Sequence, residues 1–329
     1  MPTEAAGERT DDWEVDVLGE PYRALTFELR PDSEGPVVAT LVHRPAADPT
    51  GRAVLHVHGF ADYFFQTVAA DHWVERGYDF YALDLRKYGR SIRAHQTPNY
   101  VADLTSYYEE LDLAWQTVSA RHEHVVLSGH STGGLTAPLW IHDRGLAPAG
   151  LVLNSPWLAM QGDPVTRNVL LPVVGALGRR QPMRVVPRKV SGFYARSLHV
   201  DHEGEWPFDL DLKPLASFPV YAGWLRAIRA GHARIAAGLD IAAPILVLTS
   251  ARSGHASSID DPDLTSTDIV LDVEQIRRRA PLLGHHVTQV MIEGAIHDVT
   301  LSAAPIRKQV LDEVDRFLGA YVDEATPAG

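Results

Sequence analysis

The chain has 329 residues, of which 45% are hydrophobic and 22% charged, enough for a large core in one domain, or in one domain with an insertion. The 42 acidic residues outnumber the 30 basic ones, and the formal net charge of −12 argues against nucleic acid and anionic membrane surfaces as partners. The absence of cysteine excludes disulfides, thiol chemistry and cysteine-ligated metal. There is no apolar run of about 18 residues and no apolar signal-peptide core at the acidic N-terminus, so we expect a cytoplasmic protein without an integral membrane segment.

Strand-like and helix-like stretches alternate along most of the chain. After a disordered lead-in over residues 1–12, two alternating stretches predict an antiparallel pair of strands, at residues 22–30 and 37–43. Short apolar runs then predict further strands at residues 53–58, 80–85, 125–128, 150–154, 244–250 and 287–292. Between and after them, helical spacing predicts helices at residues 63–76, 100–121, 134–140, 273–283 and 304–321. This order predicts an α/β fold with a mostly parallel, doubly wound sheet and active-site residues at the carboxyl ends of its strands.

The alternation breaks between residues 158 and 239. Prolines, aromatic residues and charges are mixed there with helical fragments, at residues 167–177 and 222–235. An unstructured loop of this length is implausible in a compact domain, so an inserted, mostly helical cap fits better. The predicted division is a first core part (1–157), a helical cap or lid (158–240) and a second core part (241–329).

One short motif carries the predicted chemistry. The apolar strand at residues 125–128 runs directly into Gly-His-Ser-Thr-Gly at residues 129–133, and a helical stretch follows. This context predicts a nucleophile elbow with Ser131 as the nucleophile, since a sharp strand-to-helix turn holds the hydroxyl above the sheet edge. Glycines are needed beside the serine because side chains there would collide with the neighbouring strand and helix.

A serine hydroxyl needs a base, and 16 histidines are available. His297 follows the last predicted strand, which puts it on the same rim of the sheet as Ser131. His285 and His286 precede that strand and belong on the opposite rim. We expect the turn to point His130 away from Ser131, as a packing residue. His297 is therefore the candidate base.

The acid that orients the histidine is expected in the loop after residues 244–250. Asp268 is the first candidate, because the apolar residues that follow it are suited to hold it under the sheet rim near His297. Other carboxylates of this loop compete for the role, of which the last sits where a helix N-cap is wanted: Asp260, Asp261, Asp263 and Asp272.

An oxyanion hole needs two backbone N–H groups aimed at the developing negative charge, worth roughly 3 kcal/mol each in the transition state. We expect one from Thr132, immediately after the nucleophile. The other is expected from Phe60, in the loop after the strand at residues 53–58, where Gly59 permits a close approach.

These segments together resemble the α/β-hydrolase superfamily, within it the monoacylglycerol lipase and lysophospholipase-like group related to serine peptidases of the proline iminopeptidase type. The matching segments span nearly the whole chain outside the cap, at residues 58–60, 84–91, 129–134, 154–156 and 294–298. The resemblance implies a serine triad, a two-amide oxyanion hole and a helical cap over the pocket. It supports Ser131, His297, Phe60 and Thr132, and favours Asp268 as the acid. The family usually has its acid soon after the strand, whereas residues 252–267 intervene here.

We therefore expect a serine hydrolase that cleaves a carboxylic ester, such as a monoacylglycerol, a lysophospholipid or a small ester, through an acyl-enzyme. An amide- or peptide-bond hydrolase of the proline iminopeptidase type is an alternative, since the same triad serves both. A non-catalytic binding protein on a hydrolase scaffold is another. The partner expected is a small-molecule ester. No cofactor and no metal site is expected, and the sequence does not determine the oligomeric state.

Overall fold

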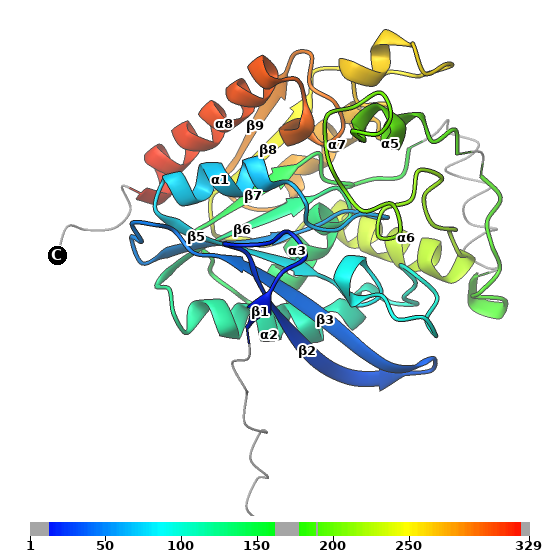
Figure 1. Cartoon of the computed structure of the whole chain (residues 1–329), viewed down its shortest axis with the longest axis horizontal. Coiled ribbons are helices and arrows are strands. Elements are labelled where there is room, and N and C mark those ends of the chain that lie inside the picture. Colours follow the sequence, from blue (N-terminus) through cyan, green and yellow to red (C-terminus); the bar gives the residue numbers. More distant parts are fainter. Residues whose placement is uncertain (1–12, 162–177, 189, 324–329) are drawn as a thin grey trace, which may run out of the picture.

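The computed structural model describes residues 13–161, 178–188 and 190–323. In this part of the chain the strands form one nine-stranded sheet in the order β1-β2-β3-β5-β4-β6-β7-β8-β9 (Figure 1). The strands are β1 Glu14–Val15, β2 Arg23–Asp32, β3 Gly35–Arg44, β4 Arg52–Val57, β5 Tyr78–Asp84, β6 His124–His130, β7 Gly150–Asn154, β8 Ile245–Ser250 and β9 Val287–Ile292. β1, β2 and β3 pair antiparallel, and β3 also pairs antiparallel with β5. The other six strands, β4 to β9 in chain order, run parallel to one another. The mostly parallel sheet predicted from the sequence is confirmed.

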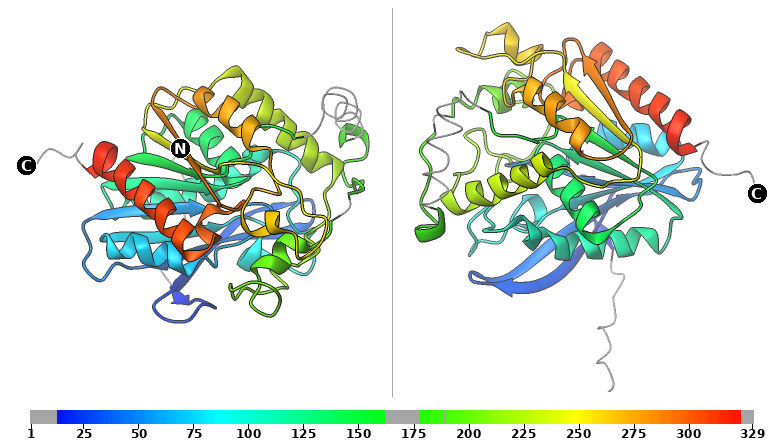
Figure 2. Two further views of the ribbon diagram at one scale, coloured as in Figure 1. Left: turned by 90° about the horizontal axis from the view of Figure 1, so that it is seen from above. Right: turned by 180° about the vertical axis from the view of Figure 1, so that it is seen from behind.

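Helices cover both faces of the sheet (Figures 1 and 2). One face packs against α1 Thr67–Glu75 and α8 Ala304–Leu318. The opposite face packs against α2 Tyr108–Ser119, α3 Gly133–Arg144, α6 Ala222–Ala237 and α7 Val273–Arg279. Because helices bury both faces, the central strands are continuous apolar runs rather than alternating ones.

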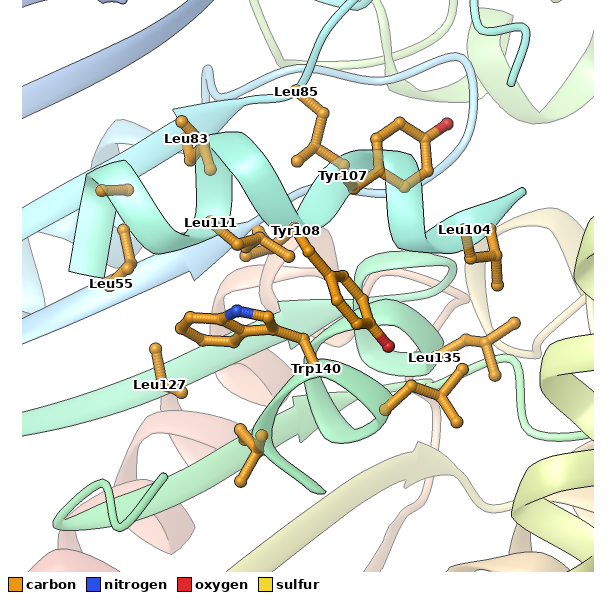
Figure 3. Close-up of a cluster of buried hydrophobic side chains, with 14 of the residues drawn as sticks. Leu55, Leu83, Leu85, Leu104, Tyr107, Tyr108, Leu111, Leu127, Leu135 and Trp140 are labelled. Atoms are coloured by element: carbon orange, nitrogen blue, oxygen red, sulfur yellow. The ribbon is translucent and has the colours of Figure 1, made fainter. Parts of the chain in front are cut away.

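Trp140 of α3 is a centre of the larger core. Its ring is fully buried, and it lies close to Leu111 and Tyr108 of α2 and to Leu127 of β6 (Figure 3). The indole N–H donates to Asp112 Oδ1 at 2.8 Å, so the polar edge of the ring is paired. This packing anchors α3 against the sheet, and α3 begins at the turn that carries Ser131.

The helix expected from Tyr63 begins four residues later, at Thr67. Tyr63 and Phe65 are buried in one small hydrophobic cluster, whereas Phe64 between them is buried in the α1–α8 core. Consecutive aromatic side chains that enter different clusters do not fit the single apolar face of a surface helix. The residues between β4 and α1 therefore form an irregular loop.

The helix expected over residues 100–121 is also shorter at its start. A 3-10 turn occupies Leu104–Tyr107, and the α-helix begins at Tyr108. The Asp103 carboxylate accepts from the Thr105 amide at 2.9 Å and caps the turn.

Between β7 and β8 the chain leaves the sheet for about ninety residues. It carries α5 Phe193–Leu198 and α6, with turns and irregular segments in the rest of its described part. Trp224, Ile228 and Ile235 of α6 are buried in the larger core, so this helix packs directly against the sheet-and-helix body of the protein. The lead-in at residues 1–12 and the helical fragment expected at 167–177 lie outside the described residues. None of the described helices has the length and apolar character needed to cross a bilayer.

Candidate active site

Ser131 occupies the sharp turn between β6 and α3. Its φ of 52° is in the left-handed region, which a serine rarely adopts. The turn is held from both sides, since the Ser131 amide donates to the Asn154 carbonyl at 3.0 Å and the Trp157 amide donates to the Ser131 carbonyl at 2.9 Å. The end of β7 thus fixes the serine in its strained conformation.

The glycines beside Ser131 are required by close approach. A Cβ atom on Gly133 would lie 2.2 Å from the Val57 carbonyl oxygen, and one on Gly134 would lie 2.6 Å from Pro156 Cβ. A Cβ on Gly129 would meet the backbone of Gly133 at 3.0 Å. The collisions predicted from the motif are present, and they allow α3 to start directly against β4 and β6.

The structure brings Ser131, His297 and Asp268 together. His297 Nε2 lies 3.1 Å from Ser131 Oγ, and its Nδ1 lies 2.9 Å from Asp268 Oδ2. Since an ionised carboxylate only accepts, Nδ1 carries the proton and Nε2 is left to accept from the serine hydroxyl. All three residues are buried, with exposed fractions of 7% for Ser131, 3% for His297 and 0% for Asp268.

Asp268 reaches this position although residues 252–267 separate it from Ala251, because the intervening loop folds back on itself. The Asp268 amide donates to the Arg252 carbonyl at 3.1 Å, and the Gly254 amide donates to the Asp268 carbonyl at 2.9 Å. Its Oδ1 accepts from the amides of Val270 and Leu271 at 2.8 and 2.7 Å. These two donors orient the carboxylate so that Oδ2 is directed to His297.

The other carboxylates of the loop are engaged elsewhere or exposed. Asp272 caps the N-terminus of α7, and Asp261 caps the 3-10 turn Pro262–Thr265. Asp263 pairs with Arg252, and Asp260 is exposed to solvent. Of the five candidates, only Asp268 contacts His297 within the described residues.

Phe60 and Thr132 both lie beside Ser131, the candidate nucleophile. A Cβ atom on Gly59 would lie 3.1 Å from Ser131 Cβ, so the loop after β4 runs directly past the serine. Among the described residues, neither the Phe60 amide nor the Thr132 amide donates a hydrogen bond to the protein. Both N–H groups therefore remain available to a ligand atom.

Buried polar residues surround the histidine, and the sequence analysis assigned none of them a role in the site. The His130 ring, expected to point away, lies 4.9 Å from the His297 ring between centroids, and burial lowers its pKa. Burial alone would raise the pKa of Asp298, but His130 and the hydrogen bonds of Thr300 and Asn154 lower it below its ordinary value. The Asp298 amide donates to the Tyr194 hydroxyl at 3.0 Å, which links the residue after the histidine to α5.

Asp62 and Lys213 form a buried ion pair beside the site, with Nζ and Oδ1 2.7 Å apart. Burial opposes ionisation of Asp62, yet the charge of Lys213 lowers its pKa to about 2. Lys213 comes from the segment between β7 and β8. The pair thus ties that segment to the loop after β4.

A cavity of about 530 Å³ opens over Ser131 and His297. Three aromatic side chains form much of its wall: Phe60 lies 4.4 Å from Trp224 between ring centroids, and Trp157 lies 6.0 Å from Trp224. The segment between β7 and β8 supplies most of the remaining wall. The volume suits a small organic ligand.

His56 and His58 do not approach each other as ligands of one ion. His56 Nδ1 is hydrogen-bonded to Ser128 Oγ, and His58 Nε2 accepts from the Leu85 amide. Within the described residues, no group of three or more His, Asp or Glu side chains is arranged to hold a metal ion.

The mostly parallel sheet, the strained serine turn after β6 and the histidine after β9 define an α/β-hydrolase. The family model described as serine aminopeptidase, S33 matches residues 48–254, well over half of the chain. The chain belongs to this family. It is a serine hydrolase.

Solved structures of lipases and esterases have the same fold. A soluble variant of monoglyceride lipase from Saccharomyces cerevisiae, in complex with a substrate analog, has a TM-score of 0.66 at 13% identity, over 91% of this chain and 96% of that one. The monoacylglycerol lipase of Paleococcus ferrophilus has a TM-score of 0.62 at 19% identity, over 85% and 99% of the two chains. A thermostable carboxyl esterase from Bacillus coagulans, in complex with glycerol, has a TM-score of 0.64 at 16% identity, over 91% and 99%. Among curated protein sequences, none matches the chain.

Proposed function

We propose that the protein hydrolyses a carboxylic ester through an acyl-enzyme on Ser131. The observation that carries the proposal is the 3.1 Å contact between His297 Nε2 and Ser131 Oγ, made inside a cavity large enough for a small substrate. In the first step, Ser131 Oγ attacks the ester carbonyl while His297 takes the hydroxyl proton. Asp268 holds the imidazole in the required tautomer and stabilises the imidazolium that forms.

The tetrahedral oxyanion is bound by the amides of Phe60 and Thr132. His297 then gives its proton to the leaving alkoxide, and the alcohol departs. Water, activated by the same imidazole, attacks the acyl-serine and releases the carboxylic acid. Every proton transfer in this scheme passes through His297 Nε2. The chain, the substrate and water therefore supply every group that the reaction uses.

We further propose that residues 158–240 act as a cap over the cavity, between core parts 1–157 and 241–329. Support comes from the cavity wall, to which this segment contributes Arg188, Lys213 and Trp224. A monoacylglycerol, a lysophospholipid or a small ester is the substrate class expected. The names of the lipases and the esterase with this fold are consistent with that class.

Amide hydrolysis is the second candidate, because the family description names an aminopeptidase. An aminopeptidase has to bind the α-ammonium group of its substrate, for which a carboxylate is the natural partner. The carboxylate in the described cavity wall is that of Asp62, and it is already paired with Lys213. The charge distribution therefore favours the ester over the amino-terminal amide.

The test uses a fluorophosphonate probe and two chromogenic substrates, para-nitrophenyl butyrate and alanine para-nitroanilide. We expect covalent labelling and ester turnover in the wild type, both lost in Ser131→Ala and both kept in Ser266→Ala, a change in the loop before Asp268. Faster turnover of the anilide than of the ester would support the peptidase. Absence of labelling and of all turnover would favour a non-catalytic binding protein.

A further inference from the structure

Arg188 stands at the mouth of the cavity that contains Ser131. The residue is exposed, and it lines the same cavity as Phe60, Trp224 and His297. Its Nη2 donates to Ser217 Oγ at 2.8 Å and to the Phe218 carbonyl at 2.9 Å. Its guanidinium carbon lies 5.6 Å from the centre of the Phe60 ring, a cation–π distance. The head group is therefore held at one point beside the residue whose amide we assign to the oxyanion hole.

Arg188 has no carboxylate partner in the part of the chain that the structure describes. No carboxylate lies within 4 Å of its guanidinium in the described residues, although the whole chain has 42 acidic and 30 basic side chains. The other cation of the cavity wall, Lys213, is neutralised by Asp62. Burial lowers the pKa of His130, which favours its neutral form. Among the described residues of the cavity wall, Arg188 is thus the cation that has no carboxylate partner.

The support beneath Arg188 is preformed. Ser217, which accepts from the guanidinium, has a φ of 60°, a left-handed conformation that a non-glycine residue rarely adopts. Its amide donates to the Pro214 carbonyl at 2.8 Å, which closes the turn. Both contacts to this support use Nη2. The Nε and Nη1 groups donate to none of the described residues and keep the planar geometry that binds a carboxylate through two parallel hydrogen bonds.

We propose that Arg188 binds an anionic group of the substrate, so that this enzyme prefers esters that carry a carboxylate or a similar anion over neutral esters of the same size. The inference rests on the proposed ester hydrolysis at Ser131 and names the class of ester. The aromatic wall formed by Phe60, Trp157 and Trp224 contacts the apolar part of such a substrate, while the ester carbonyl lies at Ser131. A neutral ester fits the same wall but makes no ion pair at the mouth.

The test compares kcat/KM for matched pairs of esters. In the first pair the anion is on the acyl part, with monomethyl adipate against methyl hexanoate, followed by acid release. In the second it is on the alcohol part, with para-carboxyphenyl butyrate against para-carbamoylphenyl butyrate, followed by phenol release. The variants are Arg188→Gln, which removes the charge, and Arg188→Lys, which keeps it but loses the planar fork. Arg184→Gln is the control, because Arg184 is exposed, is not part of the cavity wall and contacts Gln181 instead.

In one of the two pairs, we expect the ratio of anionic to neutral kcat/KM to fall about tenfold in Arg188→Gln, with Arg188→Lys intermediate and Arg184→Gln unchanged. Added sodium chloride is expected to lower the ratio in the wild type but not in Arg188→Gln. The pair that responds identifies the side of the ester that carries the anion. If neutral esters turn over and neither ratio differs between wild type and Arg188→Gln, the inference is wrong and the proposed hydrolysis stands. If no ester turns over and the fluorophosphonate does not react, both are wrong.

Discussion

His297 Nε2 lies 3.1 Å from Ser131 Oγ, although 166 residues separate the two in the chain. The contact is possible because β6 and β9 run parallel in one sheet, so that the turns after both strands meet at the same edge. Both side chains are almost fully buried, and backbone hydrogen bonds to Asn154 and Trp157 hold the Ser131 turn in place.

Replacement of the candidate acid is expected to remove most of the activity. In Asp268→Asn, the amide side chain no longer holds Nδ1–H of His297, and the imidazole loses both its tautomer and its charge partner. We expect kcat for ester hydrolysis to fall by about 10⁴, as measured with para-nitrophenyl butyrate.

Asp272→Asn is the matched control, four residues further along the same loop. Asp272 caps α7 through the amides of Glu274 and Gln275, and asparagine is also a good N-cap. Activity and thermal midpoint should both stay close to those of the wild type. A loss of activity in this variant as large as in Asp268→Asn would contradict the assignment of the acid.

The elbow should not tolerate a methyl group at Gly133. Its Cβ would lie 2.2 Å from the Val57 carbonyl oxygen, and the obstacle is backbone, which cannot rotate away. We expect Gly133→Ala to lower the free energy of unfolding by about 3 kcal/mol, measured by urea denaturation, and to slow fluorophosphonate labelling.

Gly319→Ala serves for comparison, at the end of α8. No heavy atom lies within 4 Å of a Cβ at this position, and its φ of −57° is helical. Alanine is expected to leave the stability unchanged or to raise it by about 0.5 kcal/mol. Equal losses in the two variants would indicate that close approach is not what requires Gly133.

The buried ion pair between Arg86, just after β5, and Glu110 of α2 should be essential for stability. Glu110 is fully buried and accepts from Arg86 Nε at 2.9 Å and from Arg86 Nη2 at 2.6 Å. In Glu110→Ala the arginine keeps only the partly exposed Glu109, so we expect a loss of about 3–5 kcal/mol in the free energy of unfolding. Glu109→Ala, which leaves the buried contact in place, should cost about 1 kcal/mol or less. A reversed order in urea denaturation would refute this account.

The protein should lose stability as the pH falls from about 6.5 toward 4. Burial lowers the pKa of His56 and of His232 from 6.5 to about 4. Between these values the unfolded chain binds protons that the folded one does not, so the stabilisation is complete above pH 6.5 and is lost as the pH approaches 4. The combined effect is on the order of a few kcal/mol.

Urea denaturation at several pH values checks this expectation. His232→Gln removes one of the two groups, and its slope of unfolding free energy against pH should be shallower than that of the wild type. An identical slope in both proteins would show that His232 does not contribute.

Part of this molecule could be anticipated from local pattern. The boundaries of the six parallel strands agree with the structure to within about two residues. Five of the six are mostly apolar, since burial on both faces leaves little room for polar side chains, whereas the edge strand β9 is partly exposed. The Gly-x-Ser-x-Gly turn is predictable because its glycines form one short pattern in the sequence, although the backbone that they avoid belongs to Val57 and Pro156. By contrast, the loop at Tyr63, Phe64 and Phe65 was mistaken for helix, because only the positions of two separate clusters decide which way each ring points.

The amino-acid sequence by itself determined the order of strands and helices, the strained serine turn and the rim on which a histidine had to lie, because each depends on neighbours within a few residues. Only the tertiary structure decided which of five aspartates meets His297, that His130 lies against it, and that Arg188 stands at the cavity mouth with no carboxylate partner among the described residues. Those relationships depend on how the segments between β7 and β9 fold back over the sheet. Local propensity does not determine that path. Long-range packing and the polar contacts at Asp268, Asp62 and Ser217 determine it.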